Sequence, residues 1–134
     1  MYRSSLAICF ALVLIWTFGC SGRSGQPPTA GVKGTITMDG KPLQTGELQF
    51  GVPGAPPSVL KVADGKFSGQ APVGQNKVEL VILTDGPPNP KYQGSGAATK
   101  INTAPGKYWG PNTALDAPVS STGPNEFKFD ISSK

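Results

Sequence analysis

From residue 31 onward, apolar and polar side chains alternate in short segments that are separated by glycine, proline, asparagine and aspartate. An alternation with a period of two places the apolar side chains on one face of an extended strand, and a helical period is nearly absent. The alternation predicts strands near residues 32–38, 46–50, 59–62, 66–68, 78–83, 114–120 and 127–131. About seven short strands in roughly 100 residues predict an all-β fold, a single antiparallel β-sandwich, with a closed barrel as the alternative.

Two details of this pattern place individual strands. Asp64-Gly65 stands between two apolar segments, and this dipeptide favours a two-residue type I′ hairpin, which needs positive φ at both positions. Residues 78–83 are apolar on both faces, because Val81 and Leu83 share the face of Glu79. Such a strand is expected at the centre of a sheet, with another segment covering its outer face.

One long stretch and several prolines stand outside the alternation. Residues 84–113 form a stretch of about 30 residues without a convincing strand, which makes them the candidate functional region. Prolines disfavour strand pairing along an edge, and four of them lie near the second predicted strand. They predict a blunted edge and a monomer: Pro42, Pro53, Pro56 and Pro57.

The first twenty residues have a different character. A positive start with Arg3 is followed by an apolar segment from Leu6 to Phe18 and then by Gly19 and Cys20. This arrangement resembles a bacterial lipoprotein signal peptide, in which residues 1–19 are removed and Cys20 receives the lipid. Ordinary secretory cleavage and an uncleaved anchor are the alternatives, although the 14 residues that end at Gly19 are fewer than the roughly 20 that span a bilayer.

The rest of the chain is then one exported domain on a tether. Residues 20–30 comprise the lipidated cysteine and a flexible linker, and residues 31–134 form the domain. Cys9 leaves with the signal peptide, so no thiol remains for a disulfide or a thiolate metal site. The exported part carries 11 Lys and Arg against 8 Asp and Glu, spread singly along the sequence. A basic stripe with interleaved aromatic residues is absent from the sequence, which argues against nucleic-acid binding.

A resemblance to a known family emerges from the opening strands and the turn between them. The positions that carry it are Val32, Gly34, Ile36, Gly40, Pro42, Leu43, Gly46, Leu48 and Phe50, followed by Asp64, Phe67, Val73, Gly74, Lys107, Tyr108, Leu115, Val119, Asn125, Phe127 and Phe129. Residues 31–132 resemble a carboxypeptidase regulatory-like domain of small bacterial lipoproteins. The resemblance implies a transthyretin-like (prealbumin-like) sandwich and a non-catalytic module.

The residue types agree with a protein that is not an enzyme. The chain has no histidine, which removes histidine-based general-base catalysis, Ser-His triads and histidine metal ligands. Asp39, Asp64 and Asp85 each precede glycine, where aspartate is favoured for local hydrogen bonds in turns. No spacing of carboxylates suits a calcium loop. We therefore expect no catalytic residue, no metal site and no cofactor.

Three aromatic residues in the long stretch form the candidate ligand site. The rings of Tyr92, Tyr108 and Trp109 could stack on sugar rings. The polar side chains that accompany them are those of Lys91, Lys107, Asn102, Asn112 and Thr113. The alternative is that the rings cover the outer face of Val81 and Leu83, and one ring could be buried while another is exposed.

Together these observations predict an extracytoplasmic, lipid-anchored module at the bacterial cell envelope, at the outer membrane or the periplasmic face. Its expected role is structural or protein-interacting, with an envelope protein or polysaccharide as partner. A glycan-binding lipoprotein that uses the aromatic residues is the second hypothesis.

Overall fold

The computed structural model describes residues 25–87 and 99–134, so Cys20 and Tyr92 lie outside the described residues. Its elements are β1 (Thr29–Met38), β2 (Lys41–Pro42), β3 (Thr45–Gly51), β4 (Ser58–Ala63), β5 (Lys66–Pro72), β6 (Gly74–Val81), β7 (Leu83–Asp85), β8 (Lys100–Asn102), the 3-10 helix η2 (Gly106–Tyr108), β9 (Leu115–Val119) and β10 (Asn125–Ile131). The predicted all-β class is confirmed. All seven predicted strands are present, with their ends shifted by a few residues.

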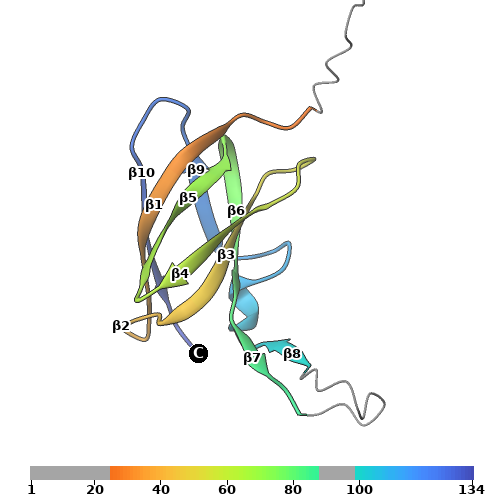
Figure 1. Ribbon diagram of the computed structural model, residues 1–134, viewed down its shortest axis with the longest axis vertical. Coiled ribbons are helices and arrows are strands. Elements are labelled where there is room, and N and C mark those ends of the chain that lie inside the picture. The colour runs from red at the N-terminus through yellow and green to blue at the C-terminus, as the bar shows by residue number, and fades with distance from the viewer. Residues whose placement is uncertain (1–24, 88–98) are drawn as a thin grey trace, which may run out of the picture.

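Eight strands form one curled sheet in the order β10-β1-β5-β4-β3-β6-β9, with β2 paired to β1 (Figure 1). Every neighbouring pair is antiparallel except β1 and β10, which run parallel from Val32↔Asn125 to Met38↔Ile131. The first and last described strands of the chain are therefore held together along seven register pairs. Strands β7 and β8 form a separate two-stranded ribbon below the sheet.

Strand β6 lies where its sequence predicts, inside the sheet, whereas β3 does not lie where the neighbouring prolines predict. Strand β6 pairs with both β3 and β9, as expected for a strand with apolar side chains on both faces. Strand β3 was expected at a blunted edge, and that prediction is wrong, because β3 pairs with β4 on one side and β6 on the other. The prolines after β3 lie instead in the connection to β4.

Two Asp-Gly dipeptides make the tight hairpins. Asp64 and Gly65 have φ of 49° and 71° and join β4 to β5 through the pair Ala63↔Lys66. The predicted type I′ hairpin is thus confirmed by its positive φ values. Asp39 and Gly40, with φ of 50° and 79°, turn the chain from β1 into β2 in the same way.

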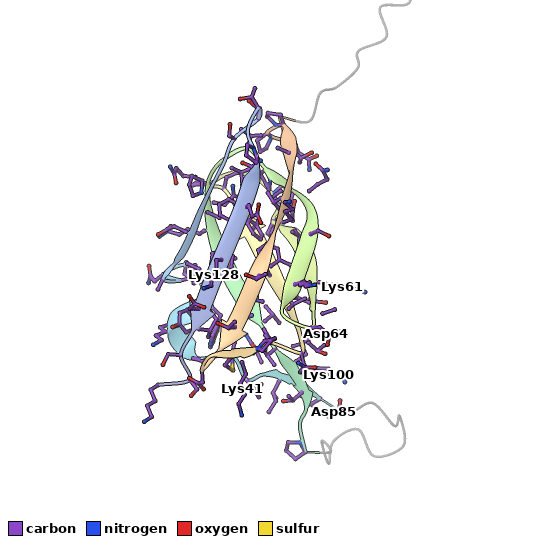
Figure 2. The ribbon with its side chains drawn as sticks, turned by 90° about the vertical axis from the view of Figure 1, so that its left-hand side faces the viewer. Lys41, Lys61, Asp64, Asp85, Lys100 and Lys128 are labelled. Atoms are coloured by element: carbon purple, nitrogen blue, oxygen red, sulfur yellow. The ribbon has the colours of Figure 1, made fainter. Side chains whose placement is uncertain are left out.

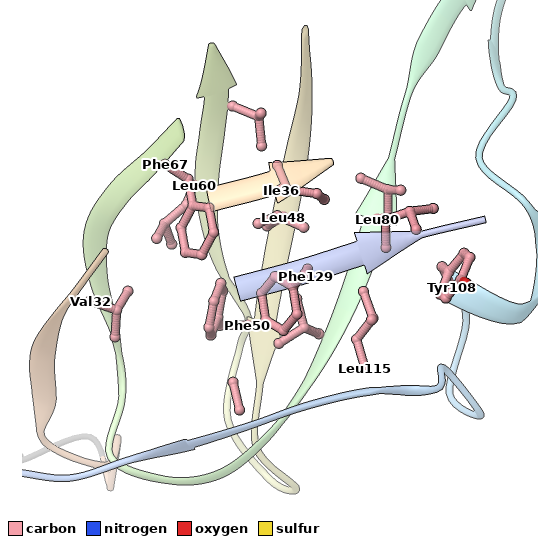
Figure 3. Close-up of a cluster of buried hydrophobic side chains, with 14 of the residues drawn as sticks. Val32, Ile36, Leu48, Phe50, Leu60, Phe67, Leu80, Tyr108, Leu115 and Phe129 are labelled. Carbon is pink, nitrogen blue, oxygen red and sulfur yellow. The ribbon is translucent and has the colours of Figure 1, made fainter. Parts of the chain in front are cut away.

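The core lies inside the curl (Figure 3). Phe50, Phe67, Phe127 and Phe129 contact one another with ring centroids 5.8–6.2 Å apart. Gly34 of β1 makes room for them, since a Cβ there would lie 2.0 Å from the carbonyl oxygen of Phe127 and 2.6 Å from the Phe67 ring.

The long stretch after residue 83 contains structure that the sequence pattern did not reveal. Strands β7 and β8 and helix η2 lie in it, so the prediction that it lacks strands is wrong for its described part. The two strands are too short, at three residues each, to show an alternation. Asn102 fixes the ribbon to the sheet, because its Oδ1 accepts hydrogen bonds from the backbone N–H groups of Ile82 and Ala104 at 2.9 and 3.1 Å.

Candidate functional site

The segment that carries Tyr108 and Trp109 begins at η2. It lies at the lower end of the curled sheet (Figure 1). Thr113 is buried, and its Oγ1 donates a 2.7 Å hydrogen bond to the carbonyl of Val78. The backbone N–H of Gly110 donates to Oε2 of Glu79 at 3.1 Å. Both bonds fasten the segment to β6.

Tyr108 points into the core. It is 7% exposed and lies on the Leu80 and Leu115 side of the buried cluster (Figure 3). Its hydroxyl accepts a 3.1 Å hydrogen bond from the backbone N–H of Ser132, directly after β10. Tyr108 therefore links the β6 side of the sheet to the β10 side, and its ring is not available for stacking on a ligand.

Trp109, the next residue, is 48% exposed. One ring is thus buried and its neighbour is exposed, which is the mixed arrangement named above as an alternative. Of the polar residues expected around a sugar, Asn112 is exposed, whereas Asn102 and Thr113 are engaged with backbone groups. The remaining aromatic candidate, Tyr92, lies outside the described residues.

The outer face of the β6 region has less cover than its sequence suggested. Val81 is half-buried, and Leu83 is 52% exposed at the start of β7. Tyr108 is buried among the core residues, and Leu83 stays largely exposed.

An open pocket of about 930 Å³ adjoins these exposed residues at the lower end of the sheet. Its apolar wall includes Met38, Leu43, Val81, Ile82 and Leu83, and its polar residues include Asp39, Glu47, Lys41 and Lys61. Sequence reasoning missed this pocket. The one available signal was the apolar outer face of residues 78–83, which supplies part of the wall.

The carboxylates of the described residues are dispersed and bind single backbone, hydroxyl or lysine groups. Hydrogen bonds from the hydroxyl and the backbone N–H of Ser133 hold the pKa of Asp39 below its ordinary value, and the charge of Lys107 adds to this. Asp130 accepts a 2.6 Å hydrogen bond from the hydroxyl of Thr37. Residues 25–87 and 99–134 contain no group of three side chains that could hold a metal ion.

Comparison of the chain with protein-family models, with curated proteins and with solved structures finds no match. Among the described residues, no helix has the length and apolar character needed to cross a membrane.

Proposed function

We propose that the chain is an exported, lipid-anchored, non-catalytic β-sandwich module with a structural or protein-interaction role at the cell envelope. The signal-like residues 1–19 and Cys20 support export and anchoring. The described fold begins with β1 at Thr29, shortly after the Gly- and Pro-containing linker.

The observation that carries the family assignment is the placement of the opening motif. Val32, Ile36, Leu48 and Phe50 are all buried in the core, with exposed fractions of 3% or less. Gly40 occupies the positive-φ position of the β1–β2 turn. These five positions of the motif thus have physical roles in the β1–β2–β3 unit, which supports the resemblance to carboxypeptidase regulatory-like domains.

Two Gly positions extend this argument. Gly46 leaves room for its neighbours at the start of β3, since a Cβ there would lie 3.3 Å from a methyl group of Leu43 and from the carbonyl of Val81 in β6. At position 34 only glycine fits, because the backbone of Phe127 leaves no room for a Cβ.

A two-layer arrangement is supported by the ladder between β4 and β5. Only two register pairs, Val62↔Phe67 and Ala63↔Lys66, join these strands next to their hairpin. Beyond the hairpin β5 pairs with β1, and β4 pairs with β3. We propose that the sheet bends at this seam into a transthyretin-like sandwich, with β10-β1-β5 facing β4-β3-β6-β9.

A monomer is supported by the way the two end strands of the sheet are connected. The buried Asn125 at the start of β10 accepts a 2.7 Å hydrogen bond from the N–H of Ser120 after β9, and its Nδ2 donates to the carbonyl of Gly31 at 3.1 Å. Tyr108 makes a second link at the lower end. Edges that face each other within one chain offer less backbone for pairing with a second copy.

The anchor is tested by labelling cells with a clickable palmitic acid analogue. We expect the wild-type protein and a Cys9→Ser variant to take up label and to fractionate with membranes, and Cys20→Ser to lose both properties. Cys9→Ser is the matched control because Cys9 lies in the segment that is removed. Label that persists in Cys20→Ser would contradict the proposed tether.

Glycan binding is a second candidate function, favoured by the exposure of Trp109. Signal-peptide removal takes away Trp16, which leaves Trp109 as the one tryptophan of the exported chain. Quenching of its fluorescence by a neutral quencher should fall when a binding saccharide is added. Unchanged quenching with every envelope polysaccharide would eliminate this candidate.

A further inference from the structure

Four lysines from four different strands border one hollow on the outer face of the sheet. Lys33 of β1, Lys61 of β4, Lys66 of β5 and Lys128 of β10 all line this hollow of about 970 Å³, which we call the lysine hollow. Figure 2 views the β10-β1-β5 side of the sheet and labels Lys128 and Lys61.

The strand register explains how these lysines come together. Thr35 of β1 is the partner of Lys128 on one side and of Lys66 on the other. Two interstrand spacings of about 4.8 Å therefore place the Cα atoms of Lys66 and Lys128 roughly 10 Å apart. Lys33 lies two residues before Thr35 in β1 and on the same face, because side chains alternate along a strand.

The charge of the hollow is unbalanced. Glu126 is the one carboxylate that lines it, 3.7 Å from the Lys33 ammonium, and Lys128 lies 3.8 Å from Asp130. Both pairs are exposed and near the limit of ion-pair distance, so they neutralise little. In the part of the chain that the structure covers, neither Lys61 nor Lys66 forms an ion pair.

Between the lysines the hollow is lined by polar side chains and by apolar ones, which include Leu60 and Ala63. Thr35, Ser68 and Gln70 contribute hydroxyl and amide groups. Phe67 and Phe127 also line it, but their rings pack against other phenylalanines of the core. Val59, at 53% exposure, is the large exposed apolar side chain of this site.

We infer that the lysine hollow binds an acidic polysaccharide, a chain of sugars that carries carboxylates at intervals. Lysine ammonium groups attract such charges, and the hydroxyl and amide groups between them match sugar hydroxyls. A polymer chain can lie in a concave hollow, whereas a flat bilayer surface would contact only its rim. Single-stranded nucleic acid would require exposed aromatic rings for base stacking, and the rings here face inward. The inference does not depend on the lipid anchor or on Trp109.

The test uses the whole chain in a non-ionic detergent and measures binding of polygalacturonate by isothermal titration calorimetry. We expect binding at low salt that weakens as sodium chloride is raised, because exposed charges are screened. The double variant Lys66→Gln/Lys128→Gln should bind about tenfold more weakly. Circular dichroism and the thermal midpoint should stay at wild-type values, because both side chains are exposed.

The matched control is Lys77→Gln/Lys100→Gln, which removes the same charge from β6 and β8. We expect it to change the affinity by less than about twofold. Equal weakening in both double variants would overturn the site, since net charge alone would then explain binding. Equal binding of neutral dextran, or no binding of polygalacturonate at low salt, would also overturn it. So would binding to phosphatidylglycerol vesicles without any binding to the polysaccharide.

Discussion

At the scale of single residues, the fold depends most on positions where a side chain would have no room. Gly34 and Gly31 both lie in β1, three residues apart, but their surroundings differ. A Cβ on Gly34 would collide with the backbone of Phe127, whereas a Cβ on Gly31 would meet only the Gln70 amide nitrogen at 3.8 Å. A backbone atom cannot move aside without disturbing the parallel β1–β10 ladder.

We therefore expect Gly34→Ala to lower the free energy of unfolding by about 3 kcal/mol or to prevent folding. Gly31→Ala should change it by less than about 1 kcal/mol. Urea unfolding of the two variants, followed by circular dichroism, measures the difference. Similar midpoints for both would show that β1 and β10 are less closely packed than described.

Asp39 gives a prediction about pH. Because its pKa is lowered by hydrogen bonds from Ser133, the folded state favours the charged carboxylate. The contact between Asp39 and the C-terminal residues should be complete above the ordinary aspartate pKa of about 3.9. It should be lost as the pH falls through the lower pKa of the folded state.

The amide signal of Ser133 in an NMR titration reports this contact, since its N–H lies 3.0 Å from Oδ1 of Asp39. We expect a midpoint below the ordinary value, an upward shift in Ser133→Ala, and no such transition in Asp39→Asn. A wild-type midpoint at or above the ordinary value would contradict the contact.

At the scale of elements, the segment that contains η2 acts as a closure between the two ends of the sheet. It is fastened to β6 by Thr113 and to the chain end after β10 by Tyr108. A single buried ring therefore stabilises the contact between strands that do not pair in the sheet.

Tyr108→Ala should destabilise the protein by about 3–5 kcal/mol, because it leaves a cavity in the core. Tyr108→Phe removes only the hydroxyl and should cost about 0.5–1.5 kcal/mol. Trp109→Ala is the matched control, with an expected cost under about 1 kcal/mol, since that ring is half exposed. Thermal unfolding of the three variants tests this order, and a larger effect of Trp109→Ala would reverse our assignment of the two rings.

At the scale of the whole molecule, stability should be uneven. The central strands β3 and β6 pair on both sides and contribute the fully buried Leu48, Phe50, Val78 and Leu80. The β7–β8 ribbon has mostly exposed residues and lies outside the main sheet. Local opening of the ribbon should thus cost much less than global unfolding.

Native-state hydrogen exchange measures this difference within one sample. We expect the hydrogen-bonded amides of β7 and β8 to exchange at least about 100-fold faster than those in the β3–β6 ladder. Equal protection would mean that the ribbon opens only when the whole sheet unfolds. The hydrogen bonds of Asn102 would then be its main attachment to the sheet.

The sequence by itself determined the all-β class, the seven main strands and the Asp64-Gly65 hairpin. Alternating side chains and Asp-Gly turns are local signals, because one strand face and one two-residue loop are each specified within a few residues. It also supplied the core residues of the opening motif and the prediction of an anchor at Cys20.

Only the tertiary structure decided which strands are neighbours and which side chains from distant segments come together. It placed β3 inside the sheet, buried Tyr108 and exposed Trp109, and paired β1 with β10 from the far end of the chain. The same pairing brought singly spaced lysines to one hollow. Strand order and register depend on contacts between distant residues, so no local pattern encodes them.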